Sequence, residues 1–432
     1  MKYKSLNSNS ELVDFETAVK TGLAKDGGLY FPTNVQPIDE SFIKNLDKKT
    51  NHEIAYEVIK QFVGLSINEA DLKKIIKKTL DFEFPLIDLE KNIKVLELFH
   101  GPTLAFKDVG ARFLANCLSH FNTKKESVVL VATSGDTGAA VANGFLGIKG
   151  TKVIILYPGG GKVSEIQERQ LTTNGENIIA MKINGVFDDC QKIVKTAFTD
   201  KDLNKKLNLT SANSINIARW LPQSFYYFFA YKELLKTNKD FVFSVPSGNF
   251  GNICAGLMAL KLGLPIKHLI ASTNVNDTVP VYFKTKKYLP KPSKQTISNA
   301  MDVGNPSNFI RILEIFDNNY DQLTSKMSSF SFNDKETLEA ISKVYNDHDY
   351  ILDTHGAVGY LGLKKYLKKN SKEIGVFLET AHPIKFADHI EKEIGISIDM
   401  PERIIALTKK EKKYIDINDY KEFKKYILNL NS

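Results

Sequence analysis

The sequence predicts an α/β protein built around a parallel sheet, preceded by a mixed and mostly helical amino-terminal region. Two observations predict this class. From residue 93 onward, apolar runs of strand length alternate with helical patterns, and that alternation is typical of parallel sheets covered by helices. The chain also has 432 residues, which is enough for two or three domains with substantial cores.

The amino-terminal region carries mainly helical patterns. Apolar residues recur at helical spacing after polar starts in residues 51–64 and 68–80. Upstream, the sequence KDGGLYFP at residues 25–32 places two glycines before an aromatic pair and a proline. This arrangement predicts a loop with extended flanks.

The α/β region follows in strand and helix units. Strands are predicted at residues 93–99, 127–132, 151–160, 241–245, 266–273 and 374–380, and helices at residues 108–121, 335–348 and 355–369. A loop and a helix are also predicted after each of the strands that end near residues 132 and 245. After residue 400 the chain is rich in charge and is expected to be peripheral.

Composition and charge argue against several classes of protein. The formal net charge is +8, but the lysines are interleaved with acidic residues and form no basic stripe with aromatic partners, so nucleic acid is not an expected partner. No apolar run is long enough to cross a membrane, and the amino terminus lacks a signal-peptide pattern. The three dispersed cysteines form neither a disulfide framework nor a zinc pattern, which favours a cytoplasmic location without a metal site.

One lysine stands apart from the others. Lys107 follows Leu-Ala-Phe in the sequence ELFHGPTLAFKD, whereas most lysines lie in runs typical of solvated helix faces. A lysine in an apolar pocket loses solvation of its ammonium group, so its pKa falls and it becomes a usable nucleophile for an aldehyde. Lys107 is therefore the candidate catalytic residue.

A glycine-rich turn follows the strand at 241–245. In PSGNFGN, Gly248 and Gly251 let the backbone approach a ligand at the start of a helix. The N–H groups and the dipole of that helix favour a phosphate group. A tight turn without a ligand is the alternative explanation.

A second turn of this kind is TSGDTGAA, which follows the strand at 127–132. Ser134, Thr137 and several N–H groups are suited to a carboxylate or a phosphate. Asp136 is unusual beside an anion, and capping of the following helix would explain it without a ligand.

These features together point to pyridoxal 5′-phosphate as the cofactor. Its aldehyde needs a lysine, and its phosphate needs a glycine-rich helix start. The dinucleotide pattern G-x-G-x-x-G is missing after the strands, so a nucleotide cofactor is not indicated.

Five motifs then resemble the threonine synthase family: HGPTLAFKD, SGDTG, SANSINIAR, PSGNFGN and TAHP, with DGGLYFP near the start. The resemblance runs from about residue 1 to about residue 400. It implies the second fold type of pyridoxal-phosphate enzymes, similar to the tryptophan synthase β chain, with two α/β domains around mostly parallel sheets. The implied divisions are an amino-terminal region (1–85), a catalytic core with the cofactor between two subdomains (86–400) and a peripheral carboxyl-terminal segment (401–432).

The resemblance also implies the roles of the site residues. Lys107 is the implied Schiff-base lysine, Thr380 the hydroxyl residue that faces the pyridine nitrogen, and Asp136 a residue near the ring hydroxyl. The implied cradle of the cofactor phosphate is Ser247, Gly248, Asn249, Phe250, Gly251 and Asn252. The implied substrate contacts are Ser134, Thr137, Asn213, Ser214, Asn216 and Arg219.

Arg219 has a competing explanation, because a polar loop that caps the helix after it would also account for SANSINIAR. The chain has only five arginines, and the planar fork of an arginine suits a phosphate group. The implied role of Arg219 is to bind the substrate phosphate as it departs.

The implied reaction converts O-phospho-L-homoserine and water to L-threonine and phosphate, the last step of threonine biosynthesis. Lys107 would act as the general base on the α-proton of the substrate and then shuttle protons. Three alternatives stay open: a phospho-lyase that releases a 2-keto acid, a related dehydratase, and a non-catalytic binding protein with the same fold.

Overall fold

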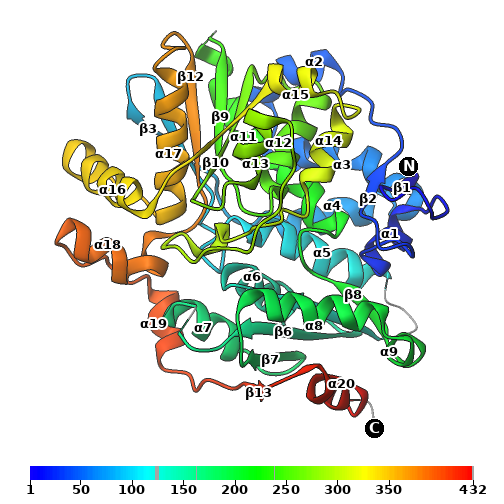
Figure 1. The fold of residues 1–432 in the computed structure, drawn as a ribbon. Helices are drawn as coiled ribbons and strands as arrows, with labels where there is room; N and C mark the ends of the chain where they lie inside the picture. The colour runs from blue at the N-terminus through cyan, green and yellow to red at the C-terminus, as the bar shows by residue number, and fades with distance from the viewer. Residues whose placement is uncertain (122–125, 162, 238, 431–432) are drawn as a thin grey trace. The chain divides into compact units, whose positions relative to one another are not determined.

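The computed structural model describes residues 1–121, 126–161, 163–237 and 239–430, and it divides into two compact units (Figure 1). Each unit is formed by separate stretches of sequence. Unit 1 comprises Met1 with residues 31–106 and 220–399, and unit 2 comprises residues 2–30, 107–219 and 400–432. The chain passes from unit 1 to unit 2 between Phe106 and Lys107.

Unit 1 contains a six-stranded sheet in the order β11-β10-β9-β12-β4-β3. Its neighbouring strands are parallel except for the pair β3 and β4, which is antiparallel. The strands are β3 (Leu86–Glu90), β4 (Ile93–Glu97), β9 (Phe241–Pro246), β10 (His268–Thr273), β11 (Met327–Ser331) and β12 (Ile374–Glu379). The helices are α2 (Glu40–Lys44), α3 (Asn51–Val63), α4 (Glu69–Thr79), α11 (Phe225–Leu234), α12 (Gly251–Lys261), α13 (Thr278–Thr285), α14 (Phe309–Ile315), α15 (Tyr320–Lys326), α16 (Asp334–His348), α17 (Thr354–Leu367) and α18 (Ala387–Ile394).

Helices cover both faces of this sheet. In α17, a Cβ on Gly362 would lie within 3.2 Å of side-chain atoms of Ser244 and Ser272. In α12, a Cβ on Gly256 would lie 2.7 Å from a methyl group of Leu269. Successive side chains of a strand point to opposite faces, so α17 and α12 lie on opposite sides of the sheet, which explains why β9 and β12 are buried along their whole length and β10 along nearly all of it.

The two helices predicted in the amino-terminal region begin at side-chain caps. Thr50 and Glu53 form a reciprocal capping box at the start of α3, and the side chain of Asn68 accepts from the N–H of Asp71 at the start of α4. Each cap satisfies N–H groups that have no partner within the helix. The predicted helices at 51–64 and 68–80 are therefore confirmed.

Unit 2 contains a five-stranded parallel sheet in the order β13-β7-β6-β5-β8. The strands are β5 (Ser127–Ala132), β6 (Thr151–Pro158), β7 (Ile178–Ile183), β8 (Asn208–Ser211) and β13 (Ile415–Ile417), with a short β1 (Tyr3–Ser5) outside this sheet. The helices are α1 (Phe15–Thr21), α5 (Lys107–Phe121), α6 (Asp136–Phe145), α7 (Glu165–Thr172), α8 (Phe187–Thr199), α9 (Lys201–Lys206), α19 (Glu402–Thr408) and α20 (Tyr420–Leu428). Two short elements, β2 (Tyr30–Pro32) and α10 (Ile217–Trp220), span points where the chain changes unit.

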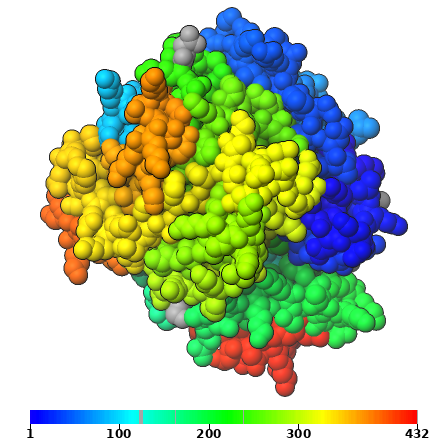
Figure 2. All heavy atoms as spheres, turned by 45° about the horizontal axis from the view of Figure 1, so that its top comes forward, coloured from blue at the N-terminus to red at the C-terminus, as the bar shows by residue number. Residues whose placement is uncertain are grey.

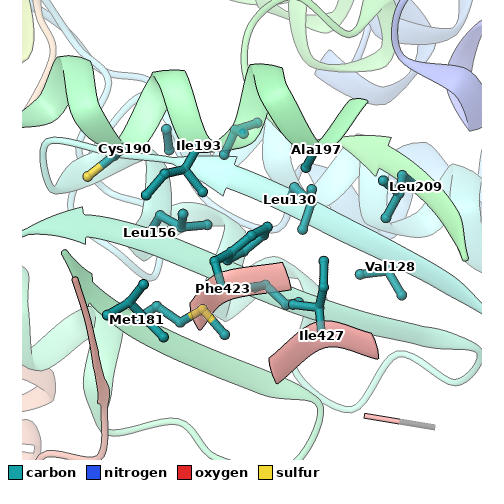
Figure 3. Packing of buried hydrophobic residues seen from close by; sticks show 14 of the residues in the cluster. Val128, Leu130, Leu156, Met181, Cys190, Ile193, Ala197, Leu209, Phe423 and Ile427 are labelled. Atoms are coloured by element: carbon teal, nitrogen blue, oxygen red, sulfur yellow. The ribbon is translucent and has the colours of Figure 1, made fainter. Parts of the chain in front are cut away.

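The carboxyl-terminal segment, expected to be peripheral, is an integral part of unit 2. β13 forms an edge of the sheet beside β7, and α20 lies at the surface, red in Figure 2. Phe423 and Ile427 of α20 are fully buried and lie among Leu130, Leu156 and Met181 of the sheet (Figure 3). The charged residues of α20 lie on one side of an amphipathic helix, and its apolar side packs into the core of this unit.

The predicted α/β class and the mostly parallel sheets are confirmed. The strands β1, β3, β7, β8, β11 and β13 were not predicted, and most of them are short or carry polar residues. The divisions proposed at residues 85 and 400 stay predictions, although residues 1–85 contribute to both units.

Candidate active site

Lys107 is the first residue of α5, in unit 2, and its ammonium group lies against a carboxylate. Its Nζ is 3.3 Å from Oδ2 of Asp136, and the two side chains are 14% and 2% exposed. An ion pair with so little water around it is only weakly screened. Asp136 therefore restrains the amine of Lys107, an arrangement that the apolar residues before Lys107 did not reveal.

The carboxylate of Asp136 is in turn held by Gln167, which lies in the first turn of α7. Nε2 of Gln167 donates to Oδ1 of Asp136 over 2.9 Å, and Gln167 is fully buried. Oε1 of Gln167 accepts from the N–H of Ser164 over 3.1 Å, as part of the capping box of α7. Gln167 was not predicted as a site residue, and the signal in the sequence is its place three residues after the cap Ser164.

The loop that carries Asp136 uses some of its own N–H groups. The hydroxyl of Thr133 accepts from the N–H of Gly135 over 2.9 Å and from the N–H of Gly138 over 2.8 Å. Ser134 and Thr137 are half-buried. Two N–H groups that were expected to face an anion, those of Gly135 and Gly138, are therefore already bonded within the loop. The hydroxyls of Ser134 and Thr137 stay predicted substrate contacts.

Asn213 and Asn216, both in SANSINIAR, bind the backbone of unit 2. The side chain of Asn213 donates to the carbonyl of Ala132 over 2.8 Å and accepts from its N–H over 3.2 Å, at the end of β5. Asn216 is fully buried, and its amide donates to the carbonyl of Val19 over 3.0 Å. Both side chains thus stabilise the loop, and their predicted contacts with substrate, like that of the half-buried Ser214, stay predictions.

Arg219 is buried in unit 2 near Asp108, the residue after Lys107. Its side chain is 2% exposed, and Nη1 donates to the carbonyl of Ala212 over 3.0 Å. Burial lowers the pKa of Arg219 to about 10, and the nearby carboxylate of Asp108 opposes that shift. The guanidinium is still charged at neutral pH, and its predicted role at the substrate phosphate stays a prediction.

The glycine-rich turn at 247–250 lies in unit 1 between β9 and α12. Phe250 adopts the left-handed conformation, with φ of 60°, so the strained position of the turn is a phenylalanine and neither Gly248 nor Gly251. A Cβ on Gly248 would lie 2.6 Å from the carbonyl oxygen of Ala300. Gly248 is therefore required for close packing of the turn against its neighbour.

Side chains hold both ends of this turn. The hydroxyl of Ser247 donates to the carbonyl of Val245 over 2.8 Å. The side-chain amide of Asn252 donates to the carbonyl of Pro246 over 2.8 Å. The backbone carbonyl of Asn252 accepts from the hydroxyl of Tyr227 over 2.8 Å. The result is a preformed turn at the start of an eleven-residue helix, which suits a phosphate group.

Thr380 follows β12 in unit 1, where it is joined to the residues just before Lys107. The carbonyl of Thr380 accepts from the N–H of Phe106 over 3.0 Å, and the N–H of His382 donates to the carbonyl of Leu104 over 3.1 Å. The motifs HGPTLAF and TAHP therefore form one backbone ladder, although they lie far apart in sequence. Thr380 itself is nearly fully buried.

A buried carboxylate supports this ladder. Asp353 caps α17, and its Oδ2 also accepts from the N–H of Ala381 over 3.2 Å. Glu379 lies beside this carboxylate: burial raises the pKa of Glu379 well above its usual range, and the neighbouring charge of Asp353 raises it further. Asp353 thus restrains the backbone beside Thr380.

Among the described residues, no group of three or more His, Cys, Asp and Glu side chains is arranged to hold a metal ion. The part of the chain that the structure describes also has no helix of sufficient length and apolar character to cross a membrane.

Comparison with known families defines the class of protein. The family described as "Pyridoxal-phosphate dependent enzyme" matches residues 85–378, and this chain is an enzyme of that class with pyridoxal 5′-phosphate as its cofactor. Two further families, "Threonine synthase N terminus" and "Threonine synthase, C-terminal", match residues 2–80 and 356–427. The chain belongs to the threonine synthase family.

Individual relatives agree with this assignment. The threonine synthase of Buchnera aphidicola from Acyrthosiphon pisum is 46% identical over 410 residues, which cover 94% of each chain. The crystal structure of threonine synthase from Escherichia coli superimposes with a TM-score of 0.94 at 39% identity, covering 99% of this chain and 100% of that one. A pyridoxal-phosphate-bound threonine synthase from Brucella melitensis gives a TM-score of 0.91 at 34% identity, covering 99% and 98%.

These findings confirm the predicted family, fold type, enzyme class and cofactor, and they exclude the non-catalytic alternative. The residues of unit 1 fit the cofactor's phosphate, because the turn at 247–250 is preformed at a helix start. The residues of unit 2 fit its aldehyde, because Lys107 presents an amine restrained by Asp136.

Proposed function

We propose that this enzyme converts O-phospho-L-homoserine and water to L-threonine and phosphate. The observation that carries the proposal is the restrained, largely buried amine of Lys107 beside Asp136, in a chain whose relatives are threonine synthases over nearly their full length. When bound, pyridoxal phosphate supplies an electrophilic carbonyl carbon and a ring that accepts electron density.

Lys107 has two roles in the proposal. Its amine would hold the cofactor through its aldehyde, and as a free amine it would take the α-proton of the substrate as a general base. Asp136 keeps the amine in place between these steps, because its carboxylate is fixed on the other side by Gln167. Asp136 is also proposed to lie near the ring hydroxyl of the cofactor.

The other predicted residues bind and orient. The turn from Ser247 to Asn252 binds the cofactor phosphate, and the hydroxyl of Thr380 faces the pyridine nitrogen. Ser134, Thr137, Asn213 and Ser214 contact the substrate, with Asn216 supporting that loop from a buried position. Arg219 binds the departing phosphate, where a guanidinium stabilises the growing negative charge. The position of the cofactor between two subdomains stays a prediction.

The proposal includes a small-molecule substrate, no nucleic-acid or membrane partner, and a cytoplasmic location. Cys117, Cys190 and Cys254 are all buried and free, which is consistent with a reducing compartment.

One incubation tests the reaction. The purified protein, loaded with pyridoxal phosphate, is mixed with O-phospho-L-homoserine, and phosphate, threonine and 2-oxobutyrate are quantified together. Equal amounts of phosphate and threonine are expected. Phosphate with 2-oxobutyrate in place of threonine would identify the phospho-lyase instead, and release of neither product would reject both.

A further inference from the structure

Arg311, in α14 of unit 1, is a charged side chain with no exposed surface. The chain has 58 lysines and arginines together, of which five are arginine. Burying a guanidinium costs free energy that must be offset by specific contacts. A position that keeps an arginine fully inside the protein, in a chain that otherwise prefers lysine, therefore calls for a physical explanation.

The contacts of Arg311 lead to the glycine-rich turn. Nη1 of Arg311 donates to Oδ1 of Asn308 over 2.7 Å, and Nδ2 of Asn308 donates to the carbonyl of Asn249 over 3.1 Å. The N–H of Asn308 donates to the same carbonyl over 3.2 Å. Arg311 thus fixes the orientation of the side-chain amide of Asn308, which donates to the backbone carbonyl of Asn249 in the turn.

Neighbouring residues grip the same turn. The N–H of Ser307 donates to Oδ1 of Asn249 over 3.1 Å. The ring of Phe250, at the left-handed position, packs edge-on against Phe309 with ring centroids 6.2 Å apart. Residues 307–311 therefore pack against the turn and hydrogen-bond to it, and Arg311 holds Asn308 in the orientation that these bonds need.

The charge of Arg311 also acts on the start of α12. Burial raises the pKa of Cys254, in the first turn of that helix, to about 12, and the positive charge of Arg311 opposes the rise. The guanidinium lies over the ring of Trp220, 4.4 Å from its centroid, which holds it in place by a cation–π contact. A fixed positive charge behind a helix start adds to the field of the helix dipole.

We propose that Arg311, acting through Asn308, is a positioning residue that shapes the turn at 247–250 and makes it selective for a phosphate dianion. This inference rests on the proposed function, in which that turn binds the cofactor phosphate. Arg311 has two effects here: it fixes the carbonyl of Asn249 so that it faces Asn308 and not the anion, and it supplies positive charge at the helix start.

The experiment compares pyridoxal phosphate with pyridoxal, which lacks the phosphate group. Dissociation constants of both are measured by equilibrium dialysis against the full-length apoprotein. The dissociation constant of pyridoxal divided by that of pyridoxal phosphate is the ratio of interest, and in the wild type it reports what the phosphate group contributes to binding. We expect the ratio to fall about tenfold or more in Arg311→Met, with a smaller fall in Arg311→Lys, which keeps the charge but loses the planar fork.

Arg169→Met is the matched control. Arg169, in unit 2, also donates to carbonyl oxygens, those of Thr408 and Lys410, each over 3.2 Å, and it has no place in the proposed turn. Its ratio should equal that of the wild type. If Arg311→Met fails to show a cooperative thermal transition, Asn308→Ala replaces it, because this variant removes the donor to Asn249 and leaves the charge buried.

The outcomes separate the inference from the function on which it rests. Equal weakening of both ligands, with an unchanged ratio in Arg311→Met or in Asn308→Ala, would overturn the inference and leave a purely structural role. Equal affinity of the wild type for both ligands would overturn the proposed role of the turn itself.

Discussion

The two strand–loop–helix turns, at 133–138 in unit 2 and at 247–250 in unit 1, look alike in sequence but have opposite electrostatic settings. The first begins its helix with a carboxylate, Asp136, paired with Lys107, and the hydroxyl of Thr133 accepts from two of its N–H groups. The second begins its helix without an acid, and the positive charge of Arg311 acts on its first turn. The first turn is suited to hold an amine, and the second is suited to hold a phosphate.

The comparison shows that the pattern strand, glycine-rich loop, helix does not by itself specify an anion. The helix dipole favours negative charge at both starts. In the turn at 133–138 that preference is already met by Asp136 itself, so the helix start stabilises the carboxylate that restrains Lys107. In the turn at 247–250 the preference is left for a ligand.

The largest expected effect is at the amine. Lys107→Ala should lower the rate of threonine formation by several orders of magnitude, because it removes both the covalent attachment and the general base. Steady-state phosphate release measures the rate, and a thermal melt checks that the fold is kept. Borohydride reduction of the wild type should label the peptide that contains Lys107. Near-normal turnover in the variant would contradict the assignment.

Gly248→Ala should damage the phosphate turn. The added Cβ would lie 2.6 Å from the carbonyl oxygen of Ala300, so the turn must shift, and we expect the affinity for pyridoxal phosphate to fall about tenfold or more. Equilibrium dialysis measures the affinity. Gly359→Ala is a milder comparison, since its Cβ would meet Cδ of Pro246 at 3.3 Å, and it should lower the affinity less. Wild-type affinity in Gly248→Ala would show that the turn does not touch the cofactor.

Arg219→Lys tests whether unit 2 also binds a phosphate, that of the substrate. Loss of a bidentate arginine contact is expected to lower kcat/KM for O-phospho-L-homoserine about tenfold, with cofactor affinity unchanged. Kinetics and melting temperature are measured on one preparation. If the variant melts earlier but keeps wild-type kcat/KM, Arg219 only supports its loop through Ala212.

Gln167→Leu tests the support of Asp136. Loss of one buried hydrogen bond is worth about 1 kcal/mol, so kcat/KM should fall about fivefold. The pH profile of kcat/KM should shift as well, because the carboxylate loses a donor. Gln170→Leu, a second mostly buried glutamine of α7, is the control and should keep the wild-type profile. Identical profiles in both variants, with only the melting temperature changed, would assign Gln167 to packing.

The smallest effect concerns stability in unit 1. Burial raises the pKa of Asp302 to about 7. Between the ordinary pKa near 4 and this value, the folded chain keeps a proton that the unfolded chain has released, so stability falls as the pH rises through that window. We expect the melting temperature to decrease less between pH 5 and pH 8 in Asp302→Asn than in the wild type. Equal decreases would show that Asp302 does not titrate in this range.

Much of the candidate site is local in sequence and was therefore predictable. Lys107 sits in a distinctive motif, and the turn at 247–250 has the glycines and the following helix that a phosphate cradle needs. The helix starts at Thr50 and Asn68 could be predicted for the same reason, because a cap and its helix are adjacent in the chain. The strand β13 and the apolar side of α20 could not, since charged residues surround them and their partners lie in other strands.

By itself, the sequence determined the kind of fold and the cofactor, and it singled out Lys107 as the candidate lysine, because each depends on short runs whose chemistry is complete within the run. The tertiary structure decided which residues support those runs. Gln167 reaches Asp136 across 31 positions, Asn308 reaches Asn249 across 59, and Thr380 joins the backbone of Phe106. A buried polar group must find a partner wherever the fold places one, and no local pattern records that partner, so only the folded chain could reveal it.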